Sequence, residues 1–309
     1  MSAYLGPLGA FTASVTWAFA STHYAEAART AGAVRVGLVR AVCASVLWLL
    51  ALALGEGLDA LGQIDAPHAL CLAGSIVCSY ALGDRVFFAA ALRIGVSSAL
   101  AIATIYPLWA ALYGTFARAE PLGLSRGVGV VCCLLGVSAV LRMGRTPTVH
   151  EAARLRPPLR EQRGDALWGA GLALLTSLFW AGNAVFLKLG SEGLSLAQAN
   201  AVRFPFGVVL LLLQLPRLRI DGALAPPSPS LPALARKLAL PLLADTGLGS
   251  VCFVYGIAHT DLALGATLSS LSPLVALPIA VVLGTERVSA GKVSAVCLTL
   301  LGVVLLVTH

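Results

Sequence analysis

The sequence predicts an all-α membrane protein, with ten transmembrane helices arranged as two inverted five-helix repeats. Three observations lead to this prediction: an apolar composition, a series of long apolar segments, and scarce residue types that recur at a fixed spacing. Hydrophobic residues make up 58% of the 309 positions and charged residues only 11%, which is far from the balance of a soluble domain. The composition therefore predicts a chain embedded in a lipid bilayer.

A helix that crosses a bilayer needs about 20 mostly apolar residues. Applied along the chain, this length predicts ten spans, at residues 3–22, 36–54, 69–92, 97–117, 124–141, 167–187, 199–215, 238–258, 262–284 and 289–308. One long polar stretch, residues 144–165, is rich in Arg and Pro and lacks apolar periodicity. We interpret it as a linker between a first five-helix unit, residues 1–143, and a second unit, residues 166–309.

Scarce residue types recur in order between the two units. With a separation of 163 positions, Ser14, Trp17 and Arg40 align with Ser177, Trp180 and Arg203. With a separation of 166 positions, Phe87, Pro107 and Glu120 align with Phe253, Pro273 and Glu286. Such self-similarity indicates a duplicated unit. Because each unit has an odd number of spans, the second enters the membrane from the opposite side, which is the inverted-repeat plan of secondary transporters.

The basic residues are distributed unevenly between the two sides of this predicted bundle. If the N-terminus lies outside, the outer loops hold only Arg118, Arg126 and Lys188 of the 21 Lys and Arg residues. Short loops rich in Lys and Arg stay in the cytoplasm, so the charges predict a multi-pass protein of the plasma (inner) membrane with both termini outside. The formal charge of +7 therefore indicates topology, and nucleic acid is not an expected partner because no soluble domain carries a basic stripe.

Two long segments resemble a known family. These are GDRVFFAAALRIGVSSALAIATIYPLWAALYGTFARAEPL in the first unit and LSPLVALPIAVVLGTERVSAGKVSAVCLTLLGVVLL in the second. Together with a Trp in the first helix and an Arg early in the second helix of each unit, they resemble the EamA-type family of the drug/metabolite transporter superfamily. The resemblance implies a ten-helix secondary transporter that exports or exchanges a small metabolite, amino acid or drug by alternating access, with cytoplasmic termini.

Ionisable side chains within the predicted spans are the first candidates for a substrate site, because each costs about 2.5 to 3.5 kcal/mol on insertion scales. Arg40 and Arg203 either extend to the nearby interface or face a central cavity, where a guanidinium can hold a carboxylate or phosphate. Asp84 and Arg85 lie in LGDRVFF, and Asp84 is a candidate proton acceptor unless the third span ends near residue 83. Asp245 is a separate acid in the second unit.

Aromatic, hydroxyl and proline residues complete the predicted cavity. Trp17 and Trp180 are either packing residues or cavity walls, and the nearby polar residues are Ser14, Ser177 and Asn183. Pro107 and Pro273 remove a backbone donor at matching positions, which either kinks both helices or frees a carbonyl as a ligand. Ser270 is added as a cavity position that a thiol probe can test.

The remaining scarce residues have structural interpretations. Glu120 and Glu286 precede the last helix of each unit and complement its dipole. Gly127, Gly129, Gly136 and Gly302 favour close helix packing, either within the bundle or in a homodimer.

Enzymatic function is not expected, because the sequence lacks metalloprotease, nucleophile-elbow and phosphate-loop motifs. No cofactor or metal site is predicted, and the seven cysteines all fall in predicted spans. The expected partners are a small-molecule substrate, the lipid bilayer and either a coupling proton or an exchanged solute. The alternative function is a non-catalytic membrane subunit that handles lipid-linked sugars or holds a complex together.

Overall fold

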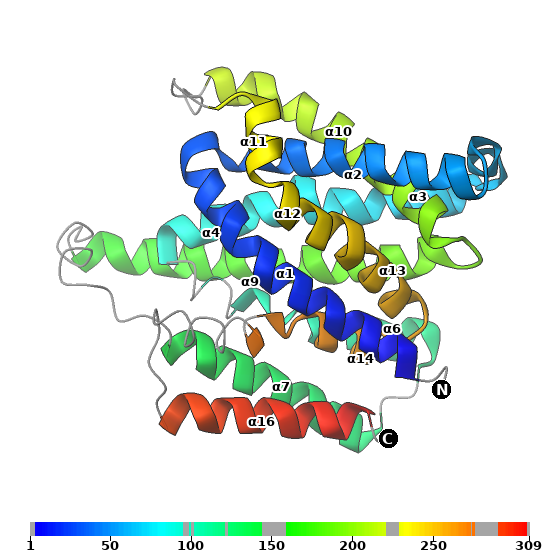
Figure 1. Cartoon of the computed structure of the whole chain (residues 1–309). Coiled ribbons are helices and arrows are strands. Elements are labelled where there is room, and N and C mark those ends of the chain that lie inside the picture. The colour runs from blue at the N-terminus through cyan, green and yellow to red at the C-terminus, as the bar shows by residue number, and fades with distance from the viewer. Residues whose placement is uncertain are drawn as a thin grey trace.

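The computed structural model describes residues 4–94, 99, 102–120, 123–143, 159–220, 229–272, 274, 275 and 290–307. These residues form a bundle of helices that run roughly alongside one another (Figure 1), and the described part of the chain contains no strand. The predicted all-helical fold class is thereby confirmed. Five segments are long and apolar enough to cross a bilayer, namely Val34–Gly55, Ala66–Phe87, Leu167–Ser191, Leu196–Gln214 and Ala239–Ala258. The shorter apolar helices are Leu124–Ala139 and Val293–Leu305.

The first half of the chain alternates long helices with short connections. Its elements are α1 (Leu5–Ala31), α2 (Ala33–Gly55), the 3-10 helix η2 (Leu58–Gln63), α3 (Ala66–Ile76), the π-helix η3 (Val77–Gly83), α4 (Asp84–Ile94), α6 (Tyr106–Arg118) and α7 (Leu124–Met143). Gly32, with φ of 81°, makes the abrupt turn from α1 into α2, a backbone conformation that glycine adopts without strain. Asp65 caps α3 by accepting a hydrogen bond from the His68 backbone N–H.

The second half contains a comparable series of helices. Its elements are α9 (Leu159–Ser191), α10 (Leu196–Ile220), α11 (Leu231–Lys237), α12 (Ala239–Leu242), the π-helix η4 (Leu243–Gly249), α13 (Ser250–Ala258), α14 (Leu262–Ser269) and α16 (Ala290–Val307). At the start of α10, Ser195 and Gln198 bond each other's backbone N–H with their side chains, which is a capping box. The positive φ of Gly193, 72°, allows the tight turn before it.

Local structure recurs at the separations that the sequence comparison identified. The helices α2 and α10 begin 163 positions apart, whereas η3 and η4, and likewise α7 and α16, begin 166 positions apart. Helical hydrogen bonding is interrupted at 104–105 and again at 270–271, also 166 positions apart. A π-helical segment is rare and is frequently found at functional sites, so its appearance at matched positions marks two equivalent places in the fold.

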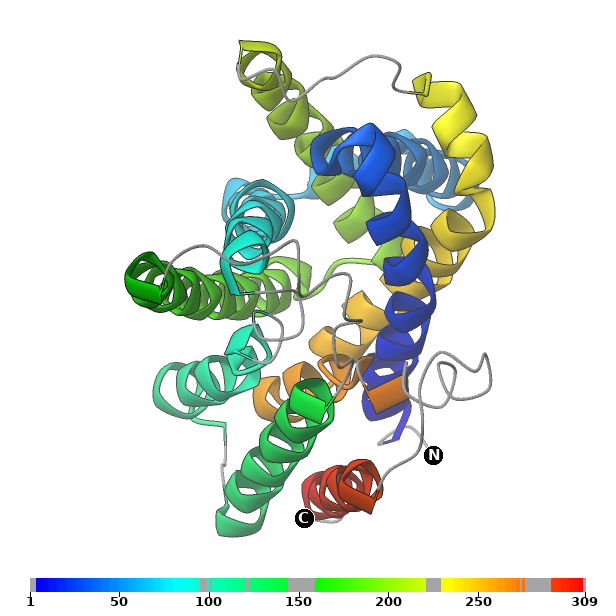
Figure 2. The ribbon, with the colours of Figure 1, turned by 90° about the vertical axis from the view of Figure 1, so that its left-hand side faces the viewer.

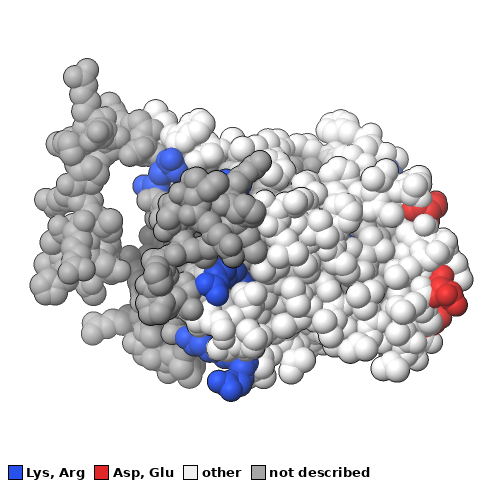
Figure 3. Space-filling model, turned by 90° about the horizontal axis from the view of Figure 1, so that it is seen from above, with Lys and Arg blue, Asp and Glu red and all other residues white. Residues whose placement is uncertain are grey.

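The bundle has two distinct ends. Both termini lie toward one of them, which we name the terminal end and which also carries the connections after α2, α6, α9 and α13 (Figure 1). The opposite end, where α1 meets α2 and where α9 begins, is named the linker end. On the face in Figure 3, Lys and Arg gather toward the linker end, while Asp and Glu lie at the terminal end. Exposed Glu56, Asp59 and Asp65 belong to the connection after α2.

The helices α7 and α16 pack side by side at one edge of the bundle (Figures 1 and 2). Gly136 of α7 lies against the α16 backbone, because a Cβ there would approach the Ala295 carbonyl oxygen to 2.7 Å. Gly302 of α16 lies equally close to the Gly129 carbonyl oxygen, also 2.7 Å from an added Cβ. These glycines therefore serve packing within the bundle, which leaves the homodimer without support from them.

Candidate functional site

A cavity of about 210 Å³ lies among the described helices and draws its lining from both halves of the chain. Its charged and amide side chains are Arg40, Asp84, Asn183, Arg203 and Asp245. Its aromatic side chains are Trp17, Tyr80, Tyr106, Trp180, Phe204 and Phe253. Hydroxyl groups come from Ser79, Thr104, Ser250, Ser269, Ser270 and Ser272. An apolar pocket with a few convergent polar groups is the usual form of a small-molecule site.

Arg40 is neutralised within the protein. Its guanidinium lies 2.9 Å from the Asp245 carboxylate, and Tyr24 donates a second hydrogen bond of 3.3 Å to the same carboxylate oxygen. The rings of Trp17, Tyr24 and Tyr80 surround the cation, with centroids 5.0, 4.5 and 4.8 Å from its central carbon. Such contacts stabilise a desolvated cation. Arg40 is buried and belongs to the cavity lining.

Arg203, its counterpart in the second half, is held without a carboxylate. Its Nε donates to Ser75 at 2.9 Å, and its terminal nitrogens approach the side-chain oxygens of Asn200 at 3.3 Å and Asn183 at 3.5 Å. The side chain belongs to none of the ion pairs formed within the described residues. The position 166 residues before Asp245 is Ser79, so the duplicated unit has no acid where symmetry would place one.

Asp84 and its neighbour Arg85 face different surroundings. Helical structure continues past residue 83, through η3 into α4. Asp84 lines the cavity together with Trp180, while Arg85 is exposed and is not among the lining residues. Asp84, like Arg203, forms no ion pair with a described residue. The cavity thus contains one carboxylate and one guanidinium that have no partner of opposite charge among the described residues within salt-bridge distance.

Several predicted site residues lie away from the cavity lining. Ser14 and Ser177 are fully buried; Ser14 donates to the Phe11 carbonyl oxygen, and Ser177 accepts a 2.9 Å bond from the Trp109 indole N–H. Pro107 is buried in the first turn of α6, beside Tyr106, which does line the cavity. Pro273 lies outside the described residues.

Two interrupted helices meet at the cavity. The interruption before α6 includes Thr104, and the interruption after α14 includes Ser270, and both residues are in the lining. The Tyr106 hydroxyl donates a 2.9 Å bond to the Ala266 carbonyl oxygen, which ties one interrupted helix to the other. Helix ends leave backbone N–H and C=O groups without intrahelical partners, and transporters use such ends to hold polar substrates.

Most of the aromatic lining lies outside the residues that the sequence pattern predicted. Four aromatic lining residues were not predicted as site residues, namely Tyr80, Tyr106, Phe204 and Phe253. The first three lie near predicted site residues in the sequence, which are Asp84, Pro107 and Arg203 respectively. Phe253 is the residue that aligns with Phe87 in the repeat. Aromatic residues close in sequence to predicted polar site residues were thus the feature from which this lining could have been predicted. Within the described residues, no group of His, Cys, Asp and Glu side chains is arranged to hold a metal ion.

Known proteins that are similar to this chain identify its family. A curated relative from Archaeoglobus fulgidus, named an uncharacterized transporter, is 26% identical over 205 residues, which cover 66% of this chain and 66% of the relative. A crystal structure of a protein that is 19% identical covers 97% of this chain and 96% of its own, with a TM-score of 0.71, and this likeness shows the fold. The model of the EamA-like transporter family matches residues 4–142 and 167–308. The chain therefore belongs to the EamA-like transporter family.

Proposed function

We propose that this protein is a secondary active transporter that exports or exchanges a small metabolite, amino acid or drug by alternating access. The observation that carries the proposal is the cavity whose charged lining comes from both halves of the chain. A cavity between two related halves can open to one side and then the other when the halves rock against each other. The family membership supports a membrane transporter in particular.

An architecture of ten spans in two inverted units is part of the proposal. The family model matches the chain twice, once on each side of the polar linker. The π-helices η3 and η4 and the two helix interruptions recur 166 positions apart, as a duplicated unit would require. The accumulation of basic side chains at the linker end supports a cytoplasmic linker and external termini.

Among the three substrate classes, the charges of the cavity favour an amino acid or a similar zwitterion. Arg40 and Asp245 neutralise each other, which leaves Arg203 for an anionic group and Asp84 for a cationic one. A guanidinium binds a carboxylate through parallel hydrogen bonds, and Asp84 in its ionised form accepts bonds from an ammonium group. The Trp180 and Phe253 rings in the same lining provide apolar surface for the rest of the solute.

Coupling to a proton or to a second solute supplies the driving force in this proposal. Asp84 is the group that we assign to proton binding, because it lines the cavity and belongs to no ion pair with a described residue. Protonation would cancel its charge and weaken its hold on an ammonium group. Exchange of one zwitterion for another would leave Asp84 ionised throughout.

The test is counterflow in proteoliposomes loaded with a mixture of metabolites, with release measured by mass spectrometry. We expect selective, saturable release of zwitterionic solutes, little release of their amides or esters, and much weaker release by Arg203→Gln at low substrate concentration. Arg236→Gln, which removes an exposed basic side chain at the linker end, is the matched control. No release above empty liposomes, with or without a proton gradient, would refute the transporter proposal and favour the membrane-subunit alternative.

A further inference from the structure

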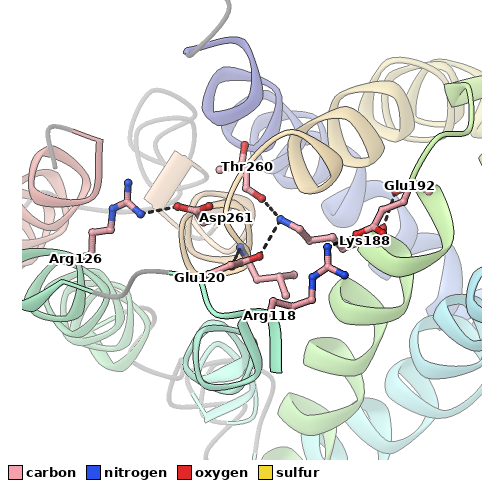
Figure 4. A network of polar contacts seen from close by, with 9 residues as sticks. Arg118, Glu120, Arg126, Lys188, Glu192, Thr260 and Asp261 are labelled. Atoms are coloured by element: carbon pink, nitrogen blue, oxygen red, sulfur yellow. Dashed lines mark hydrogen bonds and ion pairs between the residues drawn. The ribbon is translucent and has the colours of Figure 1, made fainter. Parts of the chain in front are cut away.

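Three ion pairs join the two halves of the chain at the terminal end (Figure 4). They are Arg118 with Glu192, Glu120 with Lys188, and Arg126 with Asp261. In each pair one residue precedes the polar linker and the other follows it. The basic members are the three Lys and Arg residues that the topology prediction assigns to the outer loops. The described ends of α6, α7, α9 and α14 are thereby connected across the boundary between the halves.

The pair of Lys188 with Glu120 is the most buried of the three, with side chains 12% and 14% exposed. The Lys188 ammonium lies 3.1 Å from one Glu120 oxygen and donates a 2.6 Å bond to the Thr260 carbonyl oxygen. The other Glu120 oxygen accepts a 2.7 Å bond from the Leu262 backbone N–H at the start of α14. One carboxylate and one ammonium thus hold the ends of three helices together.

The backbone around Glu120 is shaped for this contact. Ala119 has φ of 52°, a left-handed conformation that ends α6 and is strained for a residue with a side chain. The turn brings Glu120 back over Gly114, where an added Cβ would lie 2.6 Å from the Glu120 carboxylate. Helix α6 therefore ends in a local geometry that places the acid beside Lys188.

A layer of buried apolar side chains lies between these ion pairs and the cavity. Along α9, the chain passes from Asn183 in the cavity lining to Leu187 in the apolar cluster and then to Lys188. Along α13, it passes from Phe253 in the lining to Ile257 in the same cluster, and Thr260 follows in the network. Leu187 and Ile257 are fully buried. Along α9 and α13, the apolar layer and the ion pairs thus lie between the cavity lining and the terminal end.

The repeat alignment places no equivalent of these three pairs at the matching positions of the sequence. At the separations of 163 and 166 positions, Lys188 aligns with Ala25, Glu192 with Arg29 and Asp261 with Gly95, whereas Glu120, Arg118 and Arg126 align with Glu286, Gly284 and Lys292. None of the three aligned combinations pairs an acid with a base. The network is therefore not a feature inherited by both units from a shared ancestor.

We propose that this network is a gate, which holds the terminal end closed in the conformation described here and must open for the cavity to reach that side. The Lys188 and Glu120 pair is its central contact. This inference rests on the proposed alternating access. Breaking the pair removes attraction that exists only in the closed state, so the population shifts toward the state open at the terminal end.

The test measures access to the cavity without any transport. Ser250→Cys, in a background whose seven native cysteines are replaced, places one thiol in the lining. A membrane-impermeant thiol reagent is added to each side of oriented vesicles in turn. Labelling of Gly62→Cys, in the connection after α2, identifies the side on which the terminal end lies.

We expect Lys188→Gln to speed labelling of this thiol from the terminal end by about fivefold or more, the effect of losing one ion pair on a two-state equilibrium. Lys188→Arg keeps the charge and should label slowly, as the parent does, and Arg236→Gln is the control for a lost surface charge. An unchanged rate in Lys188→Gln and in the Arg118→Gln, Arg126→Gln, Lys188→Gln triple variant would overturn the gate, provided that thermal melting shows both variants folded.

The same variants separate a failed gate from a failed transporter. Faster labelling in Lys188→Gln, with no release of any solute by the parent protein, would support the gate and refute the transport proposal. Normal transport by the parent with unchanged labelling in all gate variants would support the transporter and refute the gate.

Discussion

The guanidinium of Arg40 and the carboxylate of Asp245 are 2.9 Å apart, although the two residues are separated by 205 positions in the chain. The pair joins α2 of the first half to the π-helix η4 of the second. Tyr24 adds a hydrogen bond to the carboxylate. The side chains of Arg40 and Asp245 are only 9% and 13% exposed, so each charge depends on the other for its stability inside the bundle.

Removing one member of this pair should destabilise the protein more than removing both. We expect Asp245→Asn to lower the free energy of unfolding by about 3 kcal/mol, because it leaves the Arg40 cation buried without its counter-ion. The double variant Arg40→Met, Asp245→Asn should recover part of that loss. Thermal melting in detergent measures both. If the loss of unfolding free energy in the double variant equals the sum of the losses in Arg40→Met and Asp245→Asn, the two side chains act independently.

Arg203 should contribute to substrate affinity more than to stability. Arg203→Gln removes a charge-assisted bond that contributes about 1.5 to 3 kcal/mol, which corresponds to a rise of roughly 10-fold to 100-fold in the half-saturating concentration. Arg203→Lys keeps the charge but loses the planar fork, so we expect an intermediate value. Initial rates in proteoliposomes at varied substrate concentration measure this series. Equal affinities in all three proteins would exclude Arg203 as an anion ligand.

Cysteine labelling should distinguish the lining from the packed helix faces. Ser270 lines the cavity, whereas Ser177 is fully buried and absent from the lining. In a cysteine-free background we expect Ser270→Cys to react with a small polar thiol reagent and Ser177→Cys to react at least about tenfold more slowly, since access requires local opening. Mass spectrometry of the intact protein follows both reactions. Equal rates would contradict the assigned lining.

Gly136 should be essential to the packing of α7 on α16. An added Cβ would meet backbone atoms of α16 at 2.7 and 2.9 Å, so Gly136→Ala should destabilise the protein by about 1 to 3 kcal/mol. A Cβ added at Gly127 on the same helix would have no neighbouring atom within 4 Å. Gly127→Ala should therefore be neutral or stabilise the protein by up to about 1 kcal/mol, because alanine favours helices. Chemical denaturation in mixed micelles compares them. A similar loss in both variants would mean that helix propensity, not contact with α16, sets the cost.

Asp65, at the terminal end, should make the stability of the folded protein decrease as the pH becomes acidic. The His68 backbone N–H, followed by the His68 side chain, lowers the pKa of Asp65 below its usual value. The ionised cap therefore stabilises the folded state above the unfolded-state pKa, and this contribution is lost as pH falls through the lowered folded-state pKa. We expect the melting difference between the parent and Asp65→Ala to shrink on acidification, because protonation removes the charge of the cap and leaves a neutral capping oxygen. Asp65→Asn keeps a capping oxygen without a charge, so its difference from Asp65→Ala should persist.

The composition and periodicity of the chain were sufficient to predict the helical membrane fold, because apolar length and helix-breaking residues act locally. The recurrence of Trp17 as Trp180 and of Arg40 as Arg203 marked the two matched regions that meet in the cavity. The position of Pro107 likewise marked an interruption in the helical pattern, and the helical hydrogen bonding does break at 104–105, directly before α6.

The contacts across the two halves depended on the tertiary structure, because they are set by how each helix is rotated and how deeply it sits. Sequence spacing treated Arg40 and Arg203 alike, yet within the described part of the chain Arg40 pairs with a carboxylate and Arg203 does not. It also treated Ser14 and Ser177 as lining, but their helices turn these hydroxyls toward carbonyl oxygens. Pairing Lys188 with Glu120 requires the ends of α6 and α9 to meet, which local physical chemistry along the chain does not specify.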